Sequence, residues 1–303
     1  MSVTIALAGN PNCGKTTMFN ALTGANQYVG NWPGVTVEKK EGKLKNQKDV
    51  TVTDLPGIYS LSPYTLEEVV SRDYLLKEKP DVIIDLVDAT NIERNLYLAT
   101  QLLEIGIPVV IALNMVDLLK KNNIHINVKG LSSALGCPIV ETSALKGTGL
   151  KEVVDEAIKC ANQHRVPSKQ MEFPKAVEKA VNEIEGFVPA NIAEENKRWY
   201  AVKLLERDSK VKEGLNLPAS AQSRIEEIAS GLEKAEDDDT ESIVTDGRYQ
   251  YIQKVVSANV KRSGNKMTVS DKIDRIVTNR ILGLPIFILT MFIVYYVSVT
   301  TVG

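Results

Sequence analysis

The chain has 303 residues, a net charge of −2 and a pI near 5.9, and 44% of its residues are hydrophobic. This length predicts about two domains, and the apolar content is enough for a buried core. The weakly acidic balance gives no basic field, so we expect no nucleic-acid partner. Cys13, Cys137 and Cys160 show neither metal-ligand nor disulfide spacing, which favours a reducing compartment.

The most informative segment is Gly9–Thr16, which reads GNPNCGKT. It follows an apolar run, residues 3–8, that predicts a buried strand, and it opens a predicted helix over 15–23. This context favours a phosphate-binding loop over a structural glycine turn. Glycine lets successive backbone N–H groups turn inward on an anion, and the helix adds its positive N-terminal end. Lys15 can reach the β- and γ-phosphates, and the Thr16 hydroxyl can bind Mg²⁺.

Two candidate phosphate sensors follow along the chain. The turn-rich loop 30–36, GNWPGVT, contains Thr36, which can close on Mg²⁺ when a γ-phosphate is present. Asp54-Leu-Pro-Gly57 stands at the end of a predicted strand. Asp54 can hold Mg²⁺ through a water, and the N–H of Gly57 can meet the γ-phosphate. We call residues 25–36 switch I and Leu55–Glu68 switch II.

Two further motifs point to guanine. In Asn114-Met-Val-Asp117, the carboxylate of Asp117 can accept hydrogen bonds from guanine N1–H and N2–H₂, a donor pair that adenine lacks. The backbone of Ser143-Ala144 can donate to guanine O6. Each short match alone could be a turn or a helix cap. Their order, with each motif at a strand end, favours a nucleotide site.

The first half of the chain alternates strand and helix patterns, which predicts a mostly parallel, doubly wound α/β sheet with helices on both faces. The predicted strands are 3–8, 35–44, 50–54, 82–87, 109–114 and 138–141. The predicted helices are 15–23, 65–77, 92–105, 127–135 and 150–161. A linker near 164–174 ends this pattern. The helical segments that follow are predicted at 176–185, 191–206, 220–234 (with Ser220 as N-cap) and 240–260.

The C-terminal region is uncharged over residues 281–302, long enough for a membrane span of about 20 residues. Basic residues precede it, which favours the cytoplasmic side for that flank. A buried helix of a soluble domain is the alternative. The expected organisation is a GTPase domain over 1–165, a helical domain over 166–265, a basic linker over 266–280 and a transmembrane helix over 281–303.

These motifs resemble those of the translation-factor-related P-loop GTPases of the Ras and TrmE-Era type, over about residues 1–162. The loop GNPNCGKTT (9–17) and the switch GNWPGVTVE (30–38) together look like the FeoB family of bacterial ferrous iron transporters. The order of GTPase, helical domain and membrane segment looks the same. Met115 also matches the family, in place of the commoner Lys. The lost alkyl stem over the base predicts weak nucleotide affinity.

The resemblance implies a function and partners. It implies a GTP hydrolase whose nucleotide state gates Fe²⁺ transport, with a helical domain that acts as a nucleotide-dissociation inhibitor or coupling element. The expected partners are GTP or GDP, ferrous iron, the protein's own membrane domain and a second copy of the chain. The expected location is the bacterial inner membrane, as a multi-pass protein with residues 1–280 in the cytoplasm.

The usual means of positioning the attacking water is missing, because Ile58 stands where Ras-like enzymes place a water-orienting Gln. No Arg lies in residues 25–36 to act as a finger. In related GTPases an Asn of the phosphate loop binds K⁺ beside the phosphates. The matching residue is Asn12, with backbone carbonyls of Gly30 and Trp32 completing the cage. We therefore expect slow, potassium-stimulated hydrolysis; the alternative is that Asn12 only shapes the loop.

The expected site can be given in full. The catalytic set is Asn12, Lys15, Thr36 and Gly57. The nucleotide-binding set is Gly9, Asn10, Pro11, Asn12, Cys13, Gly14, Lys15, Thr16, Thr17, Gly34, Val35, Thr36, Asp54, Leu55, Pro56, Gly57, Asn114, Met115, Asp117, Ser143, Ala144 and Leu145. The Mg²⁺ ligands are Thr16, Thr36 and Asp54, and the K⁺ ligands are Asn12, Gly30 and Trp32. Lys15 and the helix N-terminus predict a lowered pKa for the Cys13 thiol, although a small residue filling the loop is the plainer interpretation.

Two other functions remain open at this point. A soluble GTPase of ribosome or tRNA maturation would share the nucleotide motifs, but the chain shows no basic RNA-binding patch. A non-catalytic, nucleotide-binding membrane sensor would lack hydrolysis. The intact set of Thr16, Thr36 and Asp54 favours hydrolysis over that third interpretation.

Overall fold

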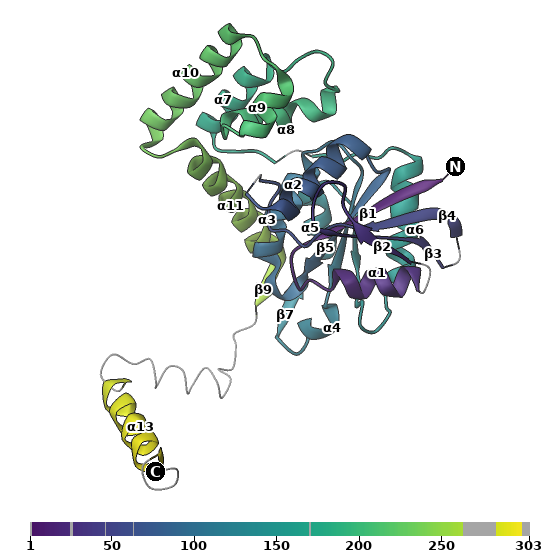
Figure 1. Ribbon diagram of the computed structural model, residues 1–303, viewed down its shortest axis with the longest axis vertical. Coiled ribbons are helices and arrows are strands. Elements are labelled where there is room, and N and C mark those ends of the chain that lie inside the picture. Colours follow the sequence, from purple (N-terminus) through teal and green to yellow (C-terminus); the bar gives the residue numbers. More distant parts are fainter. Residues whose placement is uncertain are drawn as a thin grey trace. The chain divides into compact units, whose positions relative to one another are not determined.

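The computed structural model describes residues 2–24, 27–45, 47–62, 64–169, 171–262 and 283–298. It forms two compact units, Met1–Lys261 and Arg262–Gly303, which are described separately. The first unit contains a sheet with its helices and, next to it, a cluster of helices (Figure 1).

The centre of the first unit is a seven-stranded sheet with the strand order β2-β3-β4-β1-β5-β6-β8. Its strands are β1 (Val3–Gly9), β2 (Gln27–Asn31), β3 (Glu38–Leu44), β4 (Gln47–Asp54), β5 (Val82–Asp88), β6 (Val109–Asn114) and β8 (Ile139–Glu141). The pairs from β4 through β1, β5 and β6 to β8 are parallel, whereas β2, β3 and β4 form an antiparallel meander. The central strands are almost fully buried, as expected where helices cover both faces. The predicted mostly parallel α/β sheet is confirmed.

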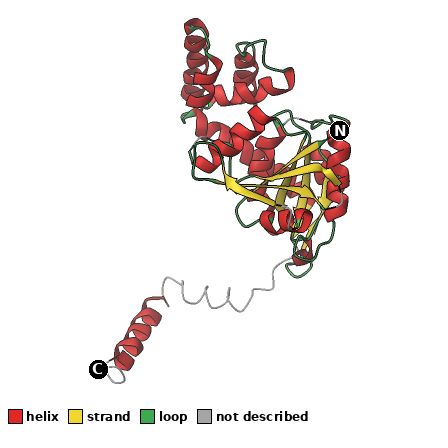
Figure 2. Ribbon diagram, turned by 45° about the vertical axis from the view of Figure 1, so that its right-hand side comes forward, coloured by secondary structure: helices red, strands yellow, loops and turns green. Residues whose placement is uncertain are grey.

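Helices cover both faces of the sheet (Figure 2). On one face, α1 (Lys15–Thr23) and α6 (Leu150–Asn162) pack on apolar side chains of β1 and β5. On the other face, α3 (Ile92–Leu103) and α5 (Val128–Leu135) pack on β5 and β6. The remaining helical segments of this part are α2 (Leu66–Asp73), the π-helical turn η1 (Tyr74–Glu78), the 3₁₀ turn η2 (Ala89–Asn91) and α4 (Val116–Leu119).

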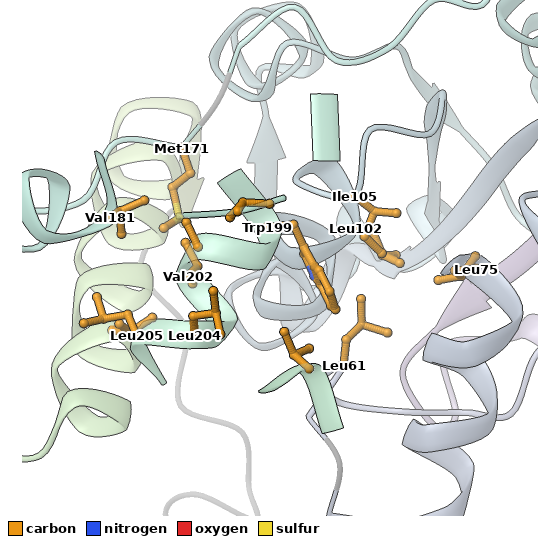
Figure 3. Close-up of a cluster of buried hydrophobic side chains, with 14 of the residues drawn as sticks. Leu61, Leu75, Leu102, Ile105, Met171, Val181, Trp199, Val202, Leu204 and Leu205 are labelled. Atoms are coloured by element: carbon orange, nitrogen blue, oxygen red, sulfur yellow. The ribbon is translucent and has the colours of Figure 1, made fainter. Parts of the chain in front are cut away.

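A helical region follows without strand alternation, as predicted. Its helices are α7 (Lys175–Glu185), α8 (Glu194–Leu205), α9 (Ser209–Leu215), α10 (Ala219–Glu236) and α11 (Thr240–Asn259). One continuous apolar core joins it to the sheet. Trp199 of α8, 1% exposed, lies at the junction, with Leu61, Leu102 and Ile105 of the sheet part near its ring (Figure 3). Because the core is shared, the helical region is packed onto the sheet part rather than tethered to it.

Several predicted boundaries were wrong. The strand expected over 35–44 begins at Glu38, because residues 32–37 form a turn in which the N–H of Trp32 donates to Val37 O at 2.8 Å. α10 begins at Ala219 after Pro218, so Ser220 is not its N-cap; proline suits a helix start because its missing N–H would have no intrahelical partner there. Strand β2 and helix α9 were missed.

A second small sheet was also missed. It pairs β7 (Ile124–Ile126) with β9 (Val260–Arg262), so the last predicted helix ends at Asn259 rather than 260. The N–H of Asn127 donates to Asn259 O at 2.8 Å beside this pair. Three-residue strands separated by more than a hundred residues carry no periodic signal of their own.

The second unit contains one described helix, α13 (Gly283–Val297), of 15 residues. Residues 263–282 and 299–303 lie outside the described part of the chain, and with them the basic linker expected at 266–280 and both ends of the expected span. Among the residues that the structure describes, no helix combines the length and apolarity needed to cross a membrane. Of the transmembrane helix predicted over 281–303, the structure describes this 15-residue helix and the residue after it, and the remainder of that prediction lies outside the described residues.

Candidate nucleotide-binding site

The loop between β1 and α1 has the backbone of a phosphate cradle. Gly14 (φ 95°) and Asn12 (φ 67°) lie in the left-handed region. A Cβ on Gly14 would come within 2.4 Å of Asn114 Nδ2, so glycine is required there by both backbone and space. These turns bring the loop's N–H groups to the start of α1, where an anion is favoured by the helix end.

Lys15, which lines the cavity, is paired with Asp54, which lies behind it. The Lys15 ammonium forms an ion pair and hydrogen bond with Asp54 Oδ1, and both side chains are buried. Burial raises the pKa of the Asp54 carboxyl, and the neighbouring Lys15 offsets part of that rise. In this arrangement the lysine that would meet a phosphate is paired with the carboxylate that would face Mg²⁺.

Asn114 joins the phosphate side of the site to the base side. Its Nδ2 donates to Cys13 O at 2.8 Å, and its Oδ1 accepts from the N–H of Ala144 at 2.9 Å. The side chain is 2% exposed. Its role in this structure is therefore to brace two loops against each other, so that their spacing suits a nucleotide.

The four motifs surround one cavity of about 680 Å³ at the carboxyl ends of the strands. The predicted residues that line it are Asn10, Pro11, Asn12, Gly14, Lys15, Thr16, Thr17, Gly57, Asn114, Met115, Asp117, Ser143, Ala144 and Leu145. Leu118 also lines it and was missed, although its position directly after Asp117 was the available signal. Leu118 and Leu145 are exposed, and they offer apolar surface for the faces of a purine.

The neighbours of Asp117 favour the ionised form of its carboxyl, which accepts hydrogen bonds. A hydrogen bond from Ser143 lowers the pKa of its carboxyl, and Lys146 lowers it further. The Lys146 ammonium lies 3.2 Å from Asp117 Oδ2. The carboxylate is thus ionised at neutral pH, which is the state that accepts from guanine N1–H and N2–H₂.

Switch I lies away from the cavity. Gly30 pairs with Lys39 in the β2–β3 ladder, and Trp32 is buried with its ring edge against Tyr74 at 5.2 Å between ring centroids. The predicted residues that do not line the cavity are Gly9, Cys13, Gly30, Trp32, Gly34, Val35, Thr36, Asp54, Leu55 and Pro56. The members that belong to switch I lie away from the cavity because residues 27–31 pair with β3 and form the edge strand of the sheet.

Of the two interpretations of Cys13, the structure supports the small residue that fills the loop and contradicts the lowered thiol pKa. The side chain is 1% exposed, and burial raises the pKa of the thiol to about 12. Lys15 lowers this pKa, but by less than burial raises it. The sulfur therefore fills space under the loop.

A mostly parallel sheet with a phosphate loop, a D-x-x-G turn and a guanine motif around one cavity defines a GTPase of the P-loop class. The match with family models is more specific. The model of ferrous iron transport protein B matches residues 3–157, and the model of the FeoB cytosolic helical domain matches residues 173–261. The chain belongs to the FeoB family.

Individual relatives agree with this assignment. The Fe(2+) transporter FeoB of Shigella flexneri is 39% identical over 314 aligned residues, which cover 99% of this chain and 39% of that protein. A Fe(2+) transport protein A/FeoB fusion protein of Porphyromonas gingivalis is 40% identical, over 97% of this chain and 36% of its own length. The chain thus spans about two fifths of the length of these curated relatives.

Solved structures match most of the chain. A GDP-bound single-residue variant of NFeoB from S. thermophilus is 47% identical, with a TM-score of 0.82 over 86% of this chain and 100% of that one. An mGMPPNP-bound NFeoB from the same organism gives a TM-score of 0.76 at 47% identity, over 87% of this chain and 100% of that one.

Proposed function

We propose that residues 1–165 form a slow, potassium-stimulated GTPase domain that, with a helical coupling domain over 166–265, gates ferrous iron transport across the bacterial inner membrane. Its proposed partners are a membrane domain and a second copy of the chain, with residues 1–280 on the cytoplasmic side. The names of the relatives support iron transport. The observation that carries the GTPase part is the single cavity shared by Lys15, Gly57, Asp117 and Ala144.

The proposed chemistry begins with binding. The loop 9–16 and Lys15 would take the phosphates, and Asp117 with the Ala144 backbone would take the guanine edge. Thr16, Thr36 and Asp54 are hard oxygen donors of the kind that hold Mg²⁺, which neutralises phosphate charge when bound. For that, Lys15 must exchange its contact with Asp54 for phosphate oxygens.

The attacking water must be positioned by groups other than the side chain of Ile58. Ile58 is 3% exposed and belongs to the main apolar core, so its side chain contacts no solvent-filled space. Its N–H donates to Gly9 O at 3.3 Å, which ties switch II to the phosphate loop. The N–H of Gly57 remains the group that would sense the γ-phosphate. This geometry supports slow hydrolysis, because the side chain of Ile58 cannot orient water as the usual Gln does.

Of the three proposed K⁺ ligands, Asn12 lines the cavity. Trp32 O accepts from the N–H of Val35 at 3.2 Å within the turn, and Gly30 is paired in the sheet. Both carbonyls would reach the cavity once residues 27–31 leave the sheet edge. K⁺ held there would supply positive charge where negative charge develops on the phosphates.

Turnover in KCl and in NaCl tests the potassium proposal. We expect faster hydrolysis in KCl, and we expect Asn12→Ala to remove the difference while GDP binding stays within about threefold, because Asn12 is one of many loop contacts. Thr17→Ala is a matched control on the same cavity wall. Equal rates in the two salts would sink the proposal.

Iron transport needs a separate test. Within the described ranges, no group of three or more His, Cys, Asp or Glu side chains could hold a metal ion, so no iron path is assigned to these residues. We expect Asp117→Asn to abolish Fe²⁺ uptake by cells that depend on this protein, because the amide NH₂ replaces an acceptor for guanine. If the variant no longer binds GDP but still takes up Fe²⁺ at the parent rate, nucleotide binding does not control transport.

A further inference from the structure

Leu61 is the point at which switch II enters the apolar core. Tyr59, two residues earlier, is 42% exposed, whereas Leu61 is fully buried in the main core, near Trp199 (Figure 3). Local hydrogen bonds tie the residues on both sides of Leu61 to the start of α2. Ser60 Oγ donates to Glu68 Oε1 at 3.0 Å, and Glu68 forms a capping box with Thr65 at the start of α2.

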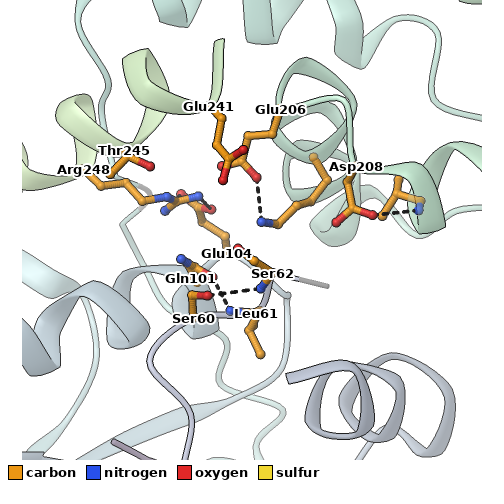
Figure 4. Close-up of polar contacts among 12 residues, drawn as sticks. Ser60, Leu61, Ser62, Gln101, Glu104, Glu206, Asp208, Glu241, Thr245 and Arg248 are labelled. Carbon is orange, nitrogen blue, oxygen red and sulfur yellow. Dashed lines mark hydrogen bonds and ion pairs between the residues drawn. The ribbon is translucent and has the colours of Figure 1, made fainter. Parts of the chain in front are cut away.

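The backbone of Leu61 is held by one side chain of α3. Its N–H donates to Gln101 Oε1 at 2.7 Å, and Gln101 is 1% exposed (Figure 4). A buried backbone N–H is costly to leave unpaired, so this acceptor holds the backbone of residue 61 in one position relative to α3. Gln101 does not line the cavity, and it lies outside the sequence motifs.

The helical region braces the same face of α3. Glu104, three residues beyond Gln101, accepts two hydrogen bonds from Arg248 of α11, at 3.0 and 2.7 Å. Both side chains are 1% exposed. Figure 4 shows the Arg248 side chain directed toward Glu104. Removing one partner of such a pair leaves an uncompensated buried charge, so α3 and α11 are locked together. Tyr64, on the far side of Leu61, donates directly to Glu241 of α11.

We propose that Gln101 is a positioning residue for GTP hydrolysis, which fixes Leu61 as the rigid end of switch II so that rearrangement at the γ-phosphate is confined to residues 55–60. The Glu104–Arg248 pair holds α3 in place, and the hydrogen bond from the Leu61 N–H to Gln101 Oε1 holds switch II to α3. Without that acceptor, Gly57 is no longer presented to the phosphate in a defined position.

Gln101→Met tests this, because it preserves length and volume but removes the acceptor. We expect kcat for GTP to fall about tenfold, from loss of one buried backbone hydrogen bond, with the Kd for a fluorescent GDP analogue within twofold. Amide hydrogen exchange at Leu61 should accelerate at least about tenfold. Thr100→Val is the matched control. It removes a partly buried hydrogen bond on the same helix, Thr100 Oγ1 to Tyr97 O, without touching switch II, and it should leave kcat unchanged.

A second measurement on the unaltered chain keeps the proposal falsifiable if the variant does not fold. The Leu61 amide should stay protected from exchange with either GDP or GMPPNP bound, whereas the amides of residues 57–59 should differ between the two states. The proposal is overturned by loss of Leu61 protection with GMPPNP, by an unchanged kcat in Gln101→Met, or by an equal loss of kcat in Thr100→Val. The proposal rests on GTP hydrolysis but not on potassium or iron. A chain that hydrolyses no GTP would refute the proposed function. Amide hydrogen exchange at Leu61 would still test whether this residue stays fixed when the nucleotide changes.

Discussion

Asp85 should make the stability of this protein depend on pH in an unusual direction. It lies in the middle of β5, beside Ala8 of β1 and Ile111 of β6, and it is 1% exposed. Within the described part of the chain its Oδ2 has no hydrogen-bond partner. Burial raises the pKa of this carboxyl from 3.8 to about 7.

The magnitude follows from linkage. Between pH 4 and 7 the unfolded chain has released this proton and the folded chain has kept it, so the free energy of unfolding falls as pH rises and levels off above about 7. A rise of about 3 pKa units corresponds to about 4 kcal/mol, of which about 3 kcal/mol is lost between pH 5 and 8. Most paired carboxylates have a lowered pKa in the folded state, so they make the free energy of unfolding rise with pH.

Asp85→Asn isolates this effect, because the amide is nearly isosteric and does not titrate. Urea unfolding of both proteins at pH 5, 6, 7 and 8 gives the difference in unfolding free energy at each pH. We expect the variant to gain about 3 kcal/mol relative to the parent from pH 5 to 8. Parallel profiles, within about 0.5 kcal/mol, would show that the carboxyl is not buried as described.

Two further outcomes follow from buried groups. Arg248→Met should lower the free energy of unfolding by about 3–5 kcal/mol, because Glu104 is left as a buried charge; Glu104→Leu added to it should recover part of the loss in urea unfolding. A loss below 1 kcal/mol would contradict this account. The native chain should resist iodoacetamide at pH 8, because Cys13, Cys137 and Cys160 are buried and burial raises each thiol pKa; intact mass should show alkylation only after unfolding in urea. Rapid labelling of the folded chain would refute it.

Sequence motifs predicted the nucleotide cavity better than they predicted the switches. Fourteen of the expected nucleotide-binding residues line it, from Asn10 to Leu145, because each motif is a short loop fixed by its own strand and helix. Switch I was predicted as a ligand loop, yet residues 27–31 form a strand with β3. Its position depends on a pairing partner, and the sequence of a short polar segment does not identify one.

The sequence by itself determined the class of fold, the motifs that surround the cavity and the division into a sheet part and a helical part. Hydrophobic periodicity and glycine chemistry act within a few residues, so they can be recognised without a partner. Tertiary structure alone decided that Gln101 holds Leu61, 40 residues away, and that Arg248 holds Glu104, 144 residues away. It also decided between the two interpretations of Cys13, since the desolvation that raises a thiol pKa depends on atoms from distant segments.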